Sequence, residues 1–558
     1  MLTDIEISNK ATPFKINQIA QKLNLTSEDI EPYGHYKAKI SRKTLQELKD
    51  SSPKGNLILI TALTPTSAGE GKSTVSIGLA DAFNQLGKSV CLSLREPSLG
   101  PCFGVKGGAT GGGYSQVIPM EDINLNFTGD IHAITSANNL LSALIDNHIK
   151  QGNLLDIQKV FFKRCIDLND RALREIEICL GSPINGTPRK DGFNISVASE
   201  IMAILCLSED LKSLKENLNQ IVIGENSKNE PIFTKDLNAT GAMAAILKNA
   251  LLPNLVQTLE HTPALIHGGP FANIAHGTSS AIATKTALKL ANYVITEAGF
   301  GADLGAEKFF NIFGRKTNIF PKAVVLVATI RALKMHGGIE KQDLHQENLD
   351  AIKKGFSNLK THIENIKKFG LTPIIAINNF ITDTQDELEL LKTLCKNEET
   401  TAIITKGWEQ GGKGCIELAN TIIEQVQNNS NYTSHQHMLY PSPAPLKEKI
   451  ETIAKEIYRA KDVSFTANAL DDLEKFTSWG YGKLPVCIAK TQNSISHDPK
   501  LLNAPTDYTF PITEIRLSAG AGFIVALSGN INTMPGLPKV PAAENIDIDD
   551  NGNITGLF

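Results

Sequence analysis

The sequence predicts an α/β protein: a P-loop-type large domain, in which helices flank a mostly parallel sheet, plus smaller α/β domains. Three observations predict this class. Apolar runs of strand length recur along the chain and are separated by segments of helix length. A glycine-rich loop joins the first of these runs to a helix. Several later runs end in glycine and polar residues, as strands do at the carboxyl edge of open parallel sheets.

The first run and the loop after it predict a phosphate site. Residues 56–63 are apolar and rich in β-branched side chains, and residues 75–86 have helical spacing up to Gly87. Loop amides and a helix amino terminus attract an anion. Lys72 would reach the β- and γ-phosphates of a nucleotide, and Ser73 or Thr74 would hold Mg²⁺. The candidate nucleotide-binding residues here are Thr66, Ser67, Ala68, Gly69, Glu70, Gly71, Lys72, Ser73 and Thr74.

Thr66 stands where the motif G-x-x-x-x-G-K-[ST] has its first glycine. The alternative to a phosphate site is an ordinary glycine-rich turn before a helix. The strand, the Lys-Ser pair and the helix together favour the phosphate site.

Length and composition narrow the class further. The chain has 558 residues, which is enough for two to four domains, and we expect units at 1–360, 361–510 and 511–558. The formal net charge is −4 and no basic block is present, so a nucleic-acid partner is not expected. No leader-like amino terminus and no apolar run of membrane-spanning length is visible. The eight cysteines are scattered without a C-x-x-C pair, which is typical of reduced thiols and predicts a cytoplasmic protein.

The second strand, residues 88–94, ends in Arg95 and Glu96. A charged pair at such a strand end contacts a ligand in many open α/β sheets, although a surface ion pair is the alternative. Residues 104–114 then hold six glycines between apolar residues, so backbone there must approach another group closely. Further on, Asp130 is a candidate Mg²⁺ ligand, whereas Glu121 and Asp122 are as readily explained as helix caps or turns.

The middle of the chain predicts scaffold helices and then a series of parallel strands. Residues 154–180 have the spacing of an amphipathic helix, and residues 194–205 resemble the capped start of a buried helix. The later strand candidates each deliver glycine and polar residues at the same end, and together they would form one long crevice. These strand candidates are residues 264–267, 293–297, 323–329, 371–377 and 401–405.

Phe300, Phe380 and Trp408 follow three of those strands. Each alone is more readily assigned to packing, but three aromatic residues at the ends of one crevice favour a flat heterocyclic ligand held by stacking. Nearer the carboxyl terminus, residues 465–484 are rich in turn formers and residues 516–528 contain a strand. The rigid loop 533–538 that follows is either a wall for an adenine or a turn after an edge strand.

Several of these segments resemble one family closely, the formate–tetrahydrofolate ligases. Two long signatures of that family stand nearly intact, at residues 104–114 and 327–338. The resemblance runs from about residue 10 to the carboxyl terminus. The other segments that carry it are 94–101, 127–132, 297–308, 533–538 and 556–558.

The resemblance implies an ATP-dependent reaction in which formate and MgATP give formyl phosphate. Tetrahydrofolate then attacks this intermediate through N10, giving 10-formyltetrahydrofolate, ADP and phosphate. It implies that Arg95 clamps formyl phosphate, that Lys72 offsets charge on the transferring phosphoryl group and that Asp130 holds or orients Mg²⁺ with Ser73 or Thr74. The resemblance also implies that Phe380 and Trp408 stack on the pterin, that Phe300 closes this pocket, and that Pro535, Gly536 and Leu537 line the nucleotide site.

The family resemblance further implies activation by a monovalent cation such as K⁺ or NH₄⁺ and a homotetramer. Three positions differ from the family pattern: Thr110 replaces an alanine, Asn126 replaces a histidine and Asn194 replaces an aspartate. The last two exchange a titratable side chain for an amide, which bears on rate and pH dependence. The competing hypothesis is a P-loop ATPase switch of the partitioning type, which residues 67–74 also resemble.

Overall fold

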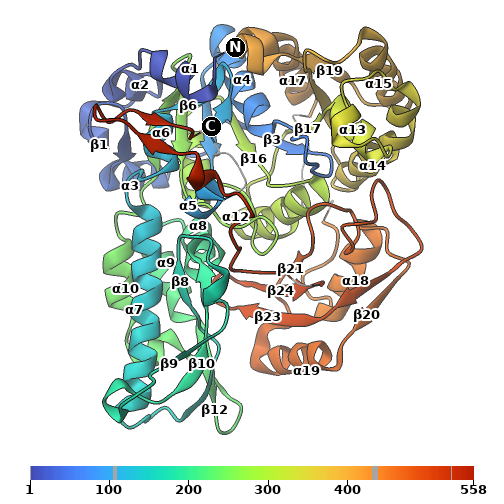
Figure 1. The fold of residues 1–558 in the computed structure, drawn as a ribbon. Helices are drawn as coiled ribbons and strands as arrows, with labels where there is room; N and C mark the ends of the chain where they lie inside the picture. Colours follow the sequence, from blue (N-terminus) through green and yellow to red (C-terminus); the bar gives the residue numbers. More distant parts are fainter. Residues whose placement is uncertain (1, 105–109, 430–437, 530, 558) are drawn as a thin grey trace.

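The structure is a computed structural model and describes residues 2–104, 110–429, 438–529 and 531–557. A large sheet with helices on both faces forms the upper part of Figure 1. Two smaller parts lie below it. One surrounds the long helix α7 (Asp130–Lys150), and the other contains α18 (Leu446–Glu456), α19 (Ala467–Phe476) and the strands around β24 (Phe523–Leu527).

The large sheet confirms the predicted series of parallel strands. Its neighbouring strands follow the order β1 (Ile30–Pro32), β2 (Ala38–Ile40), β14 (Asn254–Thr258), β15, β4, β16, β3, β17, β18, β19, and β6 (Ser115–Ile118) pairs with β14 off this path. All pairs from β15 to β19 are parallel, and β14 pairs antiparallel with β2, β6 and β15. The parallel strands are β3 (Asn56–Ala62), β4 (Val90–Leu94), β15 (Pro263–Ile266), β16 (Tyr293–Glu297), β17 (Ala323–Ala328), β18 (Ile374–Asn378) and β19 (Ala402–Thr405).

Both faces of the sheet are buried, which explains the continuous apolar runs. In β3, Leu57 and Leu59 belong to one hydrophobic cluster, whereas Ile58 and Ile60 belong to another. Helices α11 (Ala281–Leu290) and α14 (Leu349–Lys368) contribute to the first cluster, and helices α4 (Lys72–Gln85) and α17 (Ile416–Asn428) to the second. The period of two along the strand therefore places β3 between two layers of helices.

The expected boundary at residue 360 falls inside α14, and the strands on either side of this helix, β17 and β18, are hydrogen-bonded neighbours. The strands β18 and β19, which the sequence analysis placed in the second unit, thus complete the large sheet. Strands β21 (Val486–Ala489), β23 (Glu514–Ser518) and β24 form a separate small sheet. Strands β20 (Asp462–Phe465) and β22 (Thr509–Ile512) form a second one.

The helix predicted over residues 154–180 is wrong. This stretch forms short strands instead, β7 (Ile157–Val160), β8 (Arg164–Ile166) and β9 (Ile176–Ile178). Their partners are distant in sequence, since β7 pairs with β12 (Val222–Asn226) and β8 with β11 (Phe193–Ile195). Asn153, Asp156 and Cys179 have positive φ, which also interrupts helical backbone. Tertiary pairing has overridden the local spacing here.

Two other local expectations need correction. The buried helix near residue 194 is α8 (Glu200–Leu207), and Ser199 rather than Asn194 caps it by accepting a hydrogen bond from the Met202 amide. The region expected to be turn-rich contains α19, which Thr466 caps.

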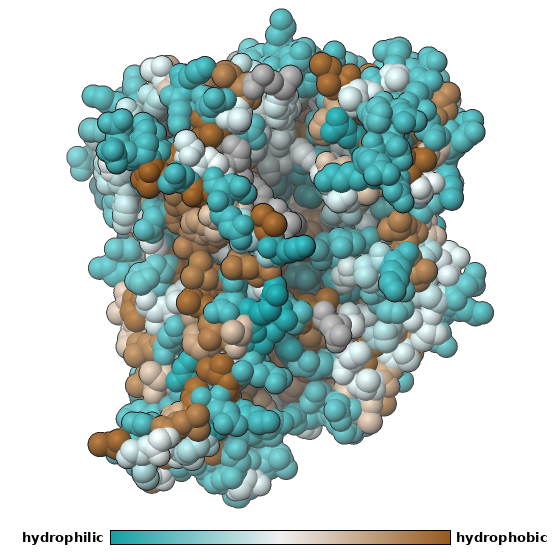
Figure 2. Space-filling model, viewed as in Figure 1, coloured by the Kyte–Doolittle hydropathy of each residue, from teal (hydrophilic) through white to brown (hydrophobic). Residues whose placement is uncertain are grey.

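The chain ends close to where it begins (Figure 1). Ile5, Met120 and Leu557 form a small buried cluster that holds the two ends together. The face in Figure 2 is hollowed near its centre, between the sheet-bearing part and the two lower parts. None of the helices formed by the described residues is long and apolar enough to span a lipid bilayer.

Candidate active site

The loop between β3 and α4 is shaped to receive an anion. Gly69 and Gly71 adopt positive φ (75° and 74°), and Gly71 immediately precedes the helix. A Cβ on Gly71 would lie 2.3 Å from Asn378 Nδ2, so only glycine fits. The Thr66 amide donates to Glu70 Oε1 (2.6 Å), which holds the loop closed. No side chain caps α4, so the amides of its first turn are available to a ligand.

Lys72, Arg95 and Glu297 gather at the ends of the adjacent strands β3, β4 and β16. Burial lowers the pKa of Lys72; Glu70 and Glu297 oppose this shift, and Arg95 adds to it by repulsion. Burial likewise lowers the pKa of Arg95, and Glu297 opposes the shift. All three side chains keep partial exposure, so a ligand can reach them. The structure thus brings together the two cations that the sequence placed 23 residues apart.

Glu297 is the residue of this cluster to which the sequence analysis gave no role. Its Oε2 accepts a hydrogen bond from the Ser73 hydroxyl (3.2 Å), and its Oε1 has no hydrogen-bond partner among the described residues. The signal in the sequence was an acidic residue at the end of a buried strand, directly before a glycine-containing loop.

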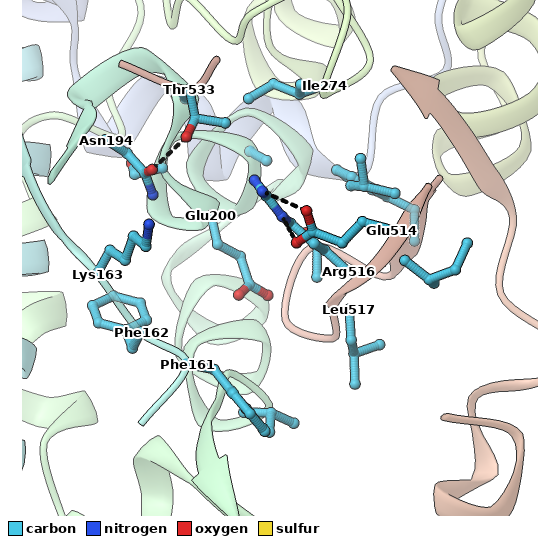
Figure 3. A pocket seen from close by; sticks show the side chains of 18 of the residues that line it. Phe161, Phe162, Lys163, Asn194, Glu200, Ile274, Glu514, Arg516, Leu517 and Thr533 are labelled. Atoms are coloured by element: carbon cyan, nitrogen blue, oxygen red, sulfur yellow. Dashed lines mark hydrogen bonds and ion pairs between the residues drawn. The ribbon is translucent and has the colours of Figure 1, made fainter. Parts of the chain in front are cut away.

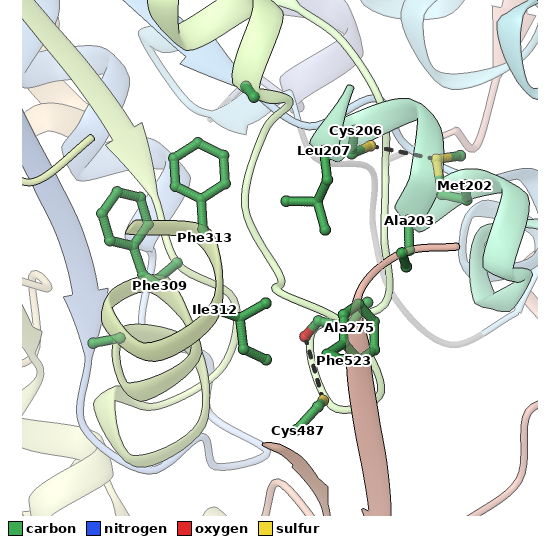
Figure 4. Packing of buried hydrophobic residues seen from close by; sticks show 14 of the residues in the cluster. Met202, Ala203, Cys206, Leu207, Ala275, Phe309, Ile312, Phe313, Cys487 and Phe523 are labelled. Atoms are coloured by element: carbon green, nitrogen blue, oxygen red, sulfur yellow. Dashed lines mark hydrogen bonds between the residues drawn. The ribbon is translucent and has the colours of Figure 1, made fainter. Parts of the chain in front are cut away.

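The loop after β15 holds Arg95 in place. Arg95 Nη1 donates to the Pro270 carbonyl (3.2 Å). Figure 4 shows this loop at Ala275. Side chains from three other segments surround it, namely Cys206 of α8, Phe313 of the helical turn Phe309–Gly314 and Cys487 of β21. A loop packed on several sides is rigid, so its carbonyl gives the guanidinium a fixed anchor.

His276, in the same loop, is buried, and neither ring nitrogen has a hydrogen-bond partner among the described residues. Burial, with repulsion from Lys316 and Arg95, lowers the pKa of His276 to about 3. The ring is therefore neutral at physiological pH.

Asp130 lies in a different cluster, at the start of α7. Lys39 Nζ bonds both carboxylate oxygens (2.8 and 2.9 Å), and Asn254 Nδ2 donates to Oδ2 (2.8 Å). The Lys39–Asp130 pair is buried. Burial raises the pKa of Glu96 well above its ordinary value. Repulsion from Asp130 adds to this shift, and Lys39 opposes it. Three hydrogen bonds already occupy the carboxylate of Asp130, so a metal ion there would have to compete with the Lys39 ammonium beside it.

The three predicted stacking residues lie at the ends of β16, β18 and β19. Phe300 follows β16 and has a positive φ of 59°. Phe380 has the Arg331 guanidinium 4.0 Å from its ring centroid, so one ring face is already covered. Trp408 lies on the backbone of Gly113, where an added Cβ would come within 2.8 Å of the indole. The Tyr114 amide also donates to the Trp408 carbonyl (2.9 Å).

The glycine-rich signature therefore supports Trp408 directly. Residues 105–109 of this signature lie outside the described residues. Thr110, one of the positions that differ from the family pattern, is buried and accepts a hydrogen bond from Asn124 Nδ2 (3.2 Å). Asn126, the second such position, is exposed.

The loop containing Pro535, Gly536 and Leu537 contacts the part of the protein around α7. Arg171 donates to the Leu537 carbonyl, and a Cβ on Gly536 would lie 2.4 Å from Arg171 Nε. Thr533 donates to Asn194 Oδ1 (2.7 Å). Among the described residues, none of the hydrogen bonds of this loop reaches the phosphate loop.

A cavity of about 390 Å³ lies between the α7 part and the small sheet of β23 and β24. Figure 3 shows Glu200 beneath it, the Thr533–Asn194 bond at one end and the Glu514–Arg516 ion pair on the other side. The amides of Gly520 and Ala521 donate to Glu200 Oε1 (2.8 and 3.3 Å). This cavity is separate from the Lys72–Arg95–Glu297 cluster, which does not line it. Among the described residues, no group of three or more His, Cys, Asp or Glu side chains is arranged to hold a metal ion.

The fold and the strand-end cluster define an α/β protein in which two cationic side chains lie at the uncapped amino terminus of a helix. Residues 2–558 match the family model described as formate–tetrahydrofolate ligase, and the chain belongs to that family. The protein is thus a ligase that forms a C–N bond, and the family implies ATP-dependent joining of formate to tetrahydrofolate.

Two solved structures were also matched. One is a point mutant of L. casei FPGS, with 11% identity and a TM-score of 0.20, covering 86% of this chain and 92% of that chain. The other is an FPGS–AMPPCP–folate complex, with 10% identity and a TM-score of 0.20, covering 86% of this chain and 91% of that chain. A TM-score of 0.20 is too low to describe this fold.

Proposed function

We propose that this ligase works through formyl phosphate and gives 10-formyltetrahydrofolate, ADP and phosphate. The observation that carries the proposal is the convergence of Lys72 and Arg95 at the uncapped amino terminus of α4. Formate is a poor electrophile because its oxygen is a poor leaving group. Transfer of the γ-phosphoryl group to a formate oxygen releases ADP and makes that oxygen part of a good leaving group.

In this proposal Lys72 and the amides of α4 offset charge on the transferring phosphoryl group. Arg95 clamps formyl phosphate, because its planar fork matches a phosphate and an acyl oxygen together. N10 of tetrahydrofolate then attacks the formyl carbon, the C–O bond to phosphate breaks, and the proton lost from N10 passes to the departing phosphate or to solvent. The Pro270 contact keeps the Arg95 guanidinium aimed at the site during both steps.

The donor set beside Lys72 suits a hard cation. The hydroxyl of Ser73, with Thr74 next to it, and the unpartnered Oε1 of Glu297 are oxygen ligands of the kind that Mg²⁺ prefers. When bound with the nucleotide, Mg²⁺ would neutralise charge on the phosphates. Asp130 would hold or orient the Mg²⁺ in competition with Lys39, whose ammonium already bonds both of its oxygens.

For the folate site, we propose that the pterin stacks on Phe380 and Trp408 and that Phe300 closes the pocket. Since Arg331 covers one face of Phe380, the pterin would use the opposite face. Residues 361–510 would thus supply the folate-binding aromatics. A homotetramer and activation by K⁺ or NH₄⁺ follow from the family resemblance, a cytoplasmic location follows from the scattered cysteines, and all three are part of the same proposal.

Turnover of ATP measured with and without the two cosubstrates tests this function. We expect negligible ADP formation until formate and tetrahydrofolate are both present. Acid treatment should then give the absorbance of methenyl-tetrahydrofolate in proportion to the ADP formed. Rapid ATP hydrolysis that neither cosubstrate changes would support the partitioning-type switch instead.

A further inference from the structure

Thr64 lies two residues beyond the end of β3, at the point where the phosphate loop leaves the sheet. It is fully buried, and each of its polar atoms is bonded. Its amide donates to Asn358 Oδ1 (3.2 Å), and its hydroxyl accepts from Asn358 Nδ2 (2.9 Å) and lies 2.9 Å from His362 Nε2. Its carbonyl lies 3.0 Å from His336 Nε2. The start of the loop is therefore held from α14 and from α13 (Ile330–His336).

Two of these side chains also bind a single residue of the carboxyl-terminal part, Asn503. Asn358 Nδ2 donates to the Asn503 carbonyl (2.7 Å), and the Asn503 amide donates to His336 Nδ1 (3.4 Å). Because Nδ1 accepts this bond, the hydrogen of the neutral ring lies on Nε2, which then donates to the Thr64 carbonyl. Asn358 and His336 thus form two bridges between the same pair of backbone segments.

The segment that ends at Asn503 begins at Lys490, and we call residues 490–503 the strap. Lys490 follows β21 and is buried, and its Nζ donates to the carbonyls of Thr491 (3.1 Å) and Ser494 (2.5 Å). The same Nζ pairs with Asp303 Oδ2 at 2.8 Å. A Cβ on Gly301 would lie 2.6 Å from Asp303 Oδ1, so Asp303 packs under the loop that carries Phe300. Lys490 therefore joins the strap to the loop of a proposed folate residue.

We propose that the strap positions the phosphate loop through Asn358 and His336, and that Lys490 links this position to the Phe300 loop. Asn358 and His336 are positioning residues, because they act on the loop through their bonds to Thr64. A small displacement of Thr64 would move Lys72 and the amides of α4 relative to the phosphates, and reactions are sensitive to errors of this size. This inference rests on the proposed function for the identity of the ligand.

The test compares Asn358→Ala with a matched control, Asn365→Ala. Asn365 is also a buried residue of α14, and its Nδ2 donates to a carbonyl of the carboxyl-terminal part, that of Ile457 (3.0 Å), without touching Thr64. Each variant loses side-chain hydrogen bonds to the same part of the protein, so both should lower the melting temperature. Only Asn358→Ala should raise the KM for MgATP, by about tenfold, with the KM for tetrahydrofolate changed less than about twofold.

A second pair keeps the test decisive if Asn358→Ala does not fold. His336→Gln retains an N–H donor that can reach the Thr64 carbonyl, whereas His336→Ala retains none. We expect the glutamine variant to recover most of the MgATP affinity that the alanine variant loses. Lys490→Met should raise the KM for both MgATP and tetrahydrofolate.

Equal kinetics for Asn358→Ala and Asn365→Ala would overturn the inference, as would His336→Ala with an unchanged KM for MgATP. Failure of the proposed function is distinguishable, because the wild-type protein would then not join formate to tetrahydrofolate in any of these assays.

Discussion

Glu297→Gln is the variant that examines the cluster most directly. The change is nearly isosteric and leaves an oxygen for the Ser73 hydroxyl, but it removes the negative charge beside Lys72 and Arg95. At an effective dielectric constant near 20, a pair of unit charges about 5 Å apart interacts by about 3 kcal/mol. Partial exposure of Glu297 screens this interaction, so we expect the free energy of unfolding to fall by about 1–3 kcal/mol.

A bound anion should restore this loss, because it supplies the missing negative charge between the two cations. A ligand at about 100 times its dissociation constant stabilises a protein by about 2.7 kcal/mol. We therefore expect inorganic phosphate to stabilise Glu297→Gln more than the wild-type protein. Urea unfolding with phosphate, and with chloride at the same ionic strength, measures this difference.

Glu260→Gln provides the control. Glu260 is a similarly half-buried carboxylate that accepts hydrogen bonds from the Gly412 amide (2.7 Å) and Gln85 Nε2 (2.6 Å), away from both cations. This variant should lose stability without gaining any extra response to phosphate. If phosphate stabilises Glu297→Gln no more than the wild-type protein, Lys72 and Arg95 do not form a common anion site and the reasoning fails.

The remaining predictions concern three other side chains. Arg95→Ala should abolish most synthesis, because Arg95 is proposed to hold formyl phosphate rather than the nucleotide. ADP binding, measured by calorimetry, should stay within about threefold of wild type. An equal loss of ADP affinity would contradict this role. Trp408→Ala should weaken tetrahydrofolate binding by about 1–3 kcal/mol with little effect on ATP, as fluorescence titration would report; unchanged folate affinity would make Trp408 a packing residue for Gly113. Burial raises the pKa of Glu200 from an ordinary 4.5 to about 7, so the folded state binds a proton that the unfolded state releases between these values. Stability should therefore fall as pH rises through this window, and Glu200→Gln, which keeps an acceptor for the Gly520 amide, should flatten the slope by about 1–3 kcal/mol in total, measured by urea unfolding from pH 5 to 8; an unchanged slope would place the titration elsewhere.

Much of the sheet could be predicted from local pattern. A strand buried on both faces is predominantly apolar, and β3 and β17 show such runs. The glycine-rich turn and the helix after it were equally predictable, because the positive φ of Gly69 and Gly71 and the start of α4 are set within a few residues of one another. The failure at residues 154–180 has the converse cause, since the partners of β7 and β8 lie about 30 to 65 residues away along the chain.

The site shows the same division. Sequence placed Lys72 and Arg95 at strand ends, and the parallel sheet then brought those ends together. The ion pair between Asp130 and Lys39 was not visible, because Lys39 lies 91 residues earlier. The assignment of residues 535–537 to the nucleotide stays a prediction, since their bonds go to Arg171 and the α7 part.

By itself, the amino-acid sequence determined the class of fold, the glycine-rich turn before α4 and the family, because these depend on short-range patterns of hydrophobicity, glycine and charge. Only the tertiary structure decided that Glu297 lies beside both cations, that Gly113 supports Trp408 and that Asn358 bridges Asn503 to Thr64. The physical reason is that such contacts join residues far apart along the chain. Their geometry exists only once the sheet has aligned the strand ends and the carboxyl-terminal part has packed against them.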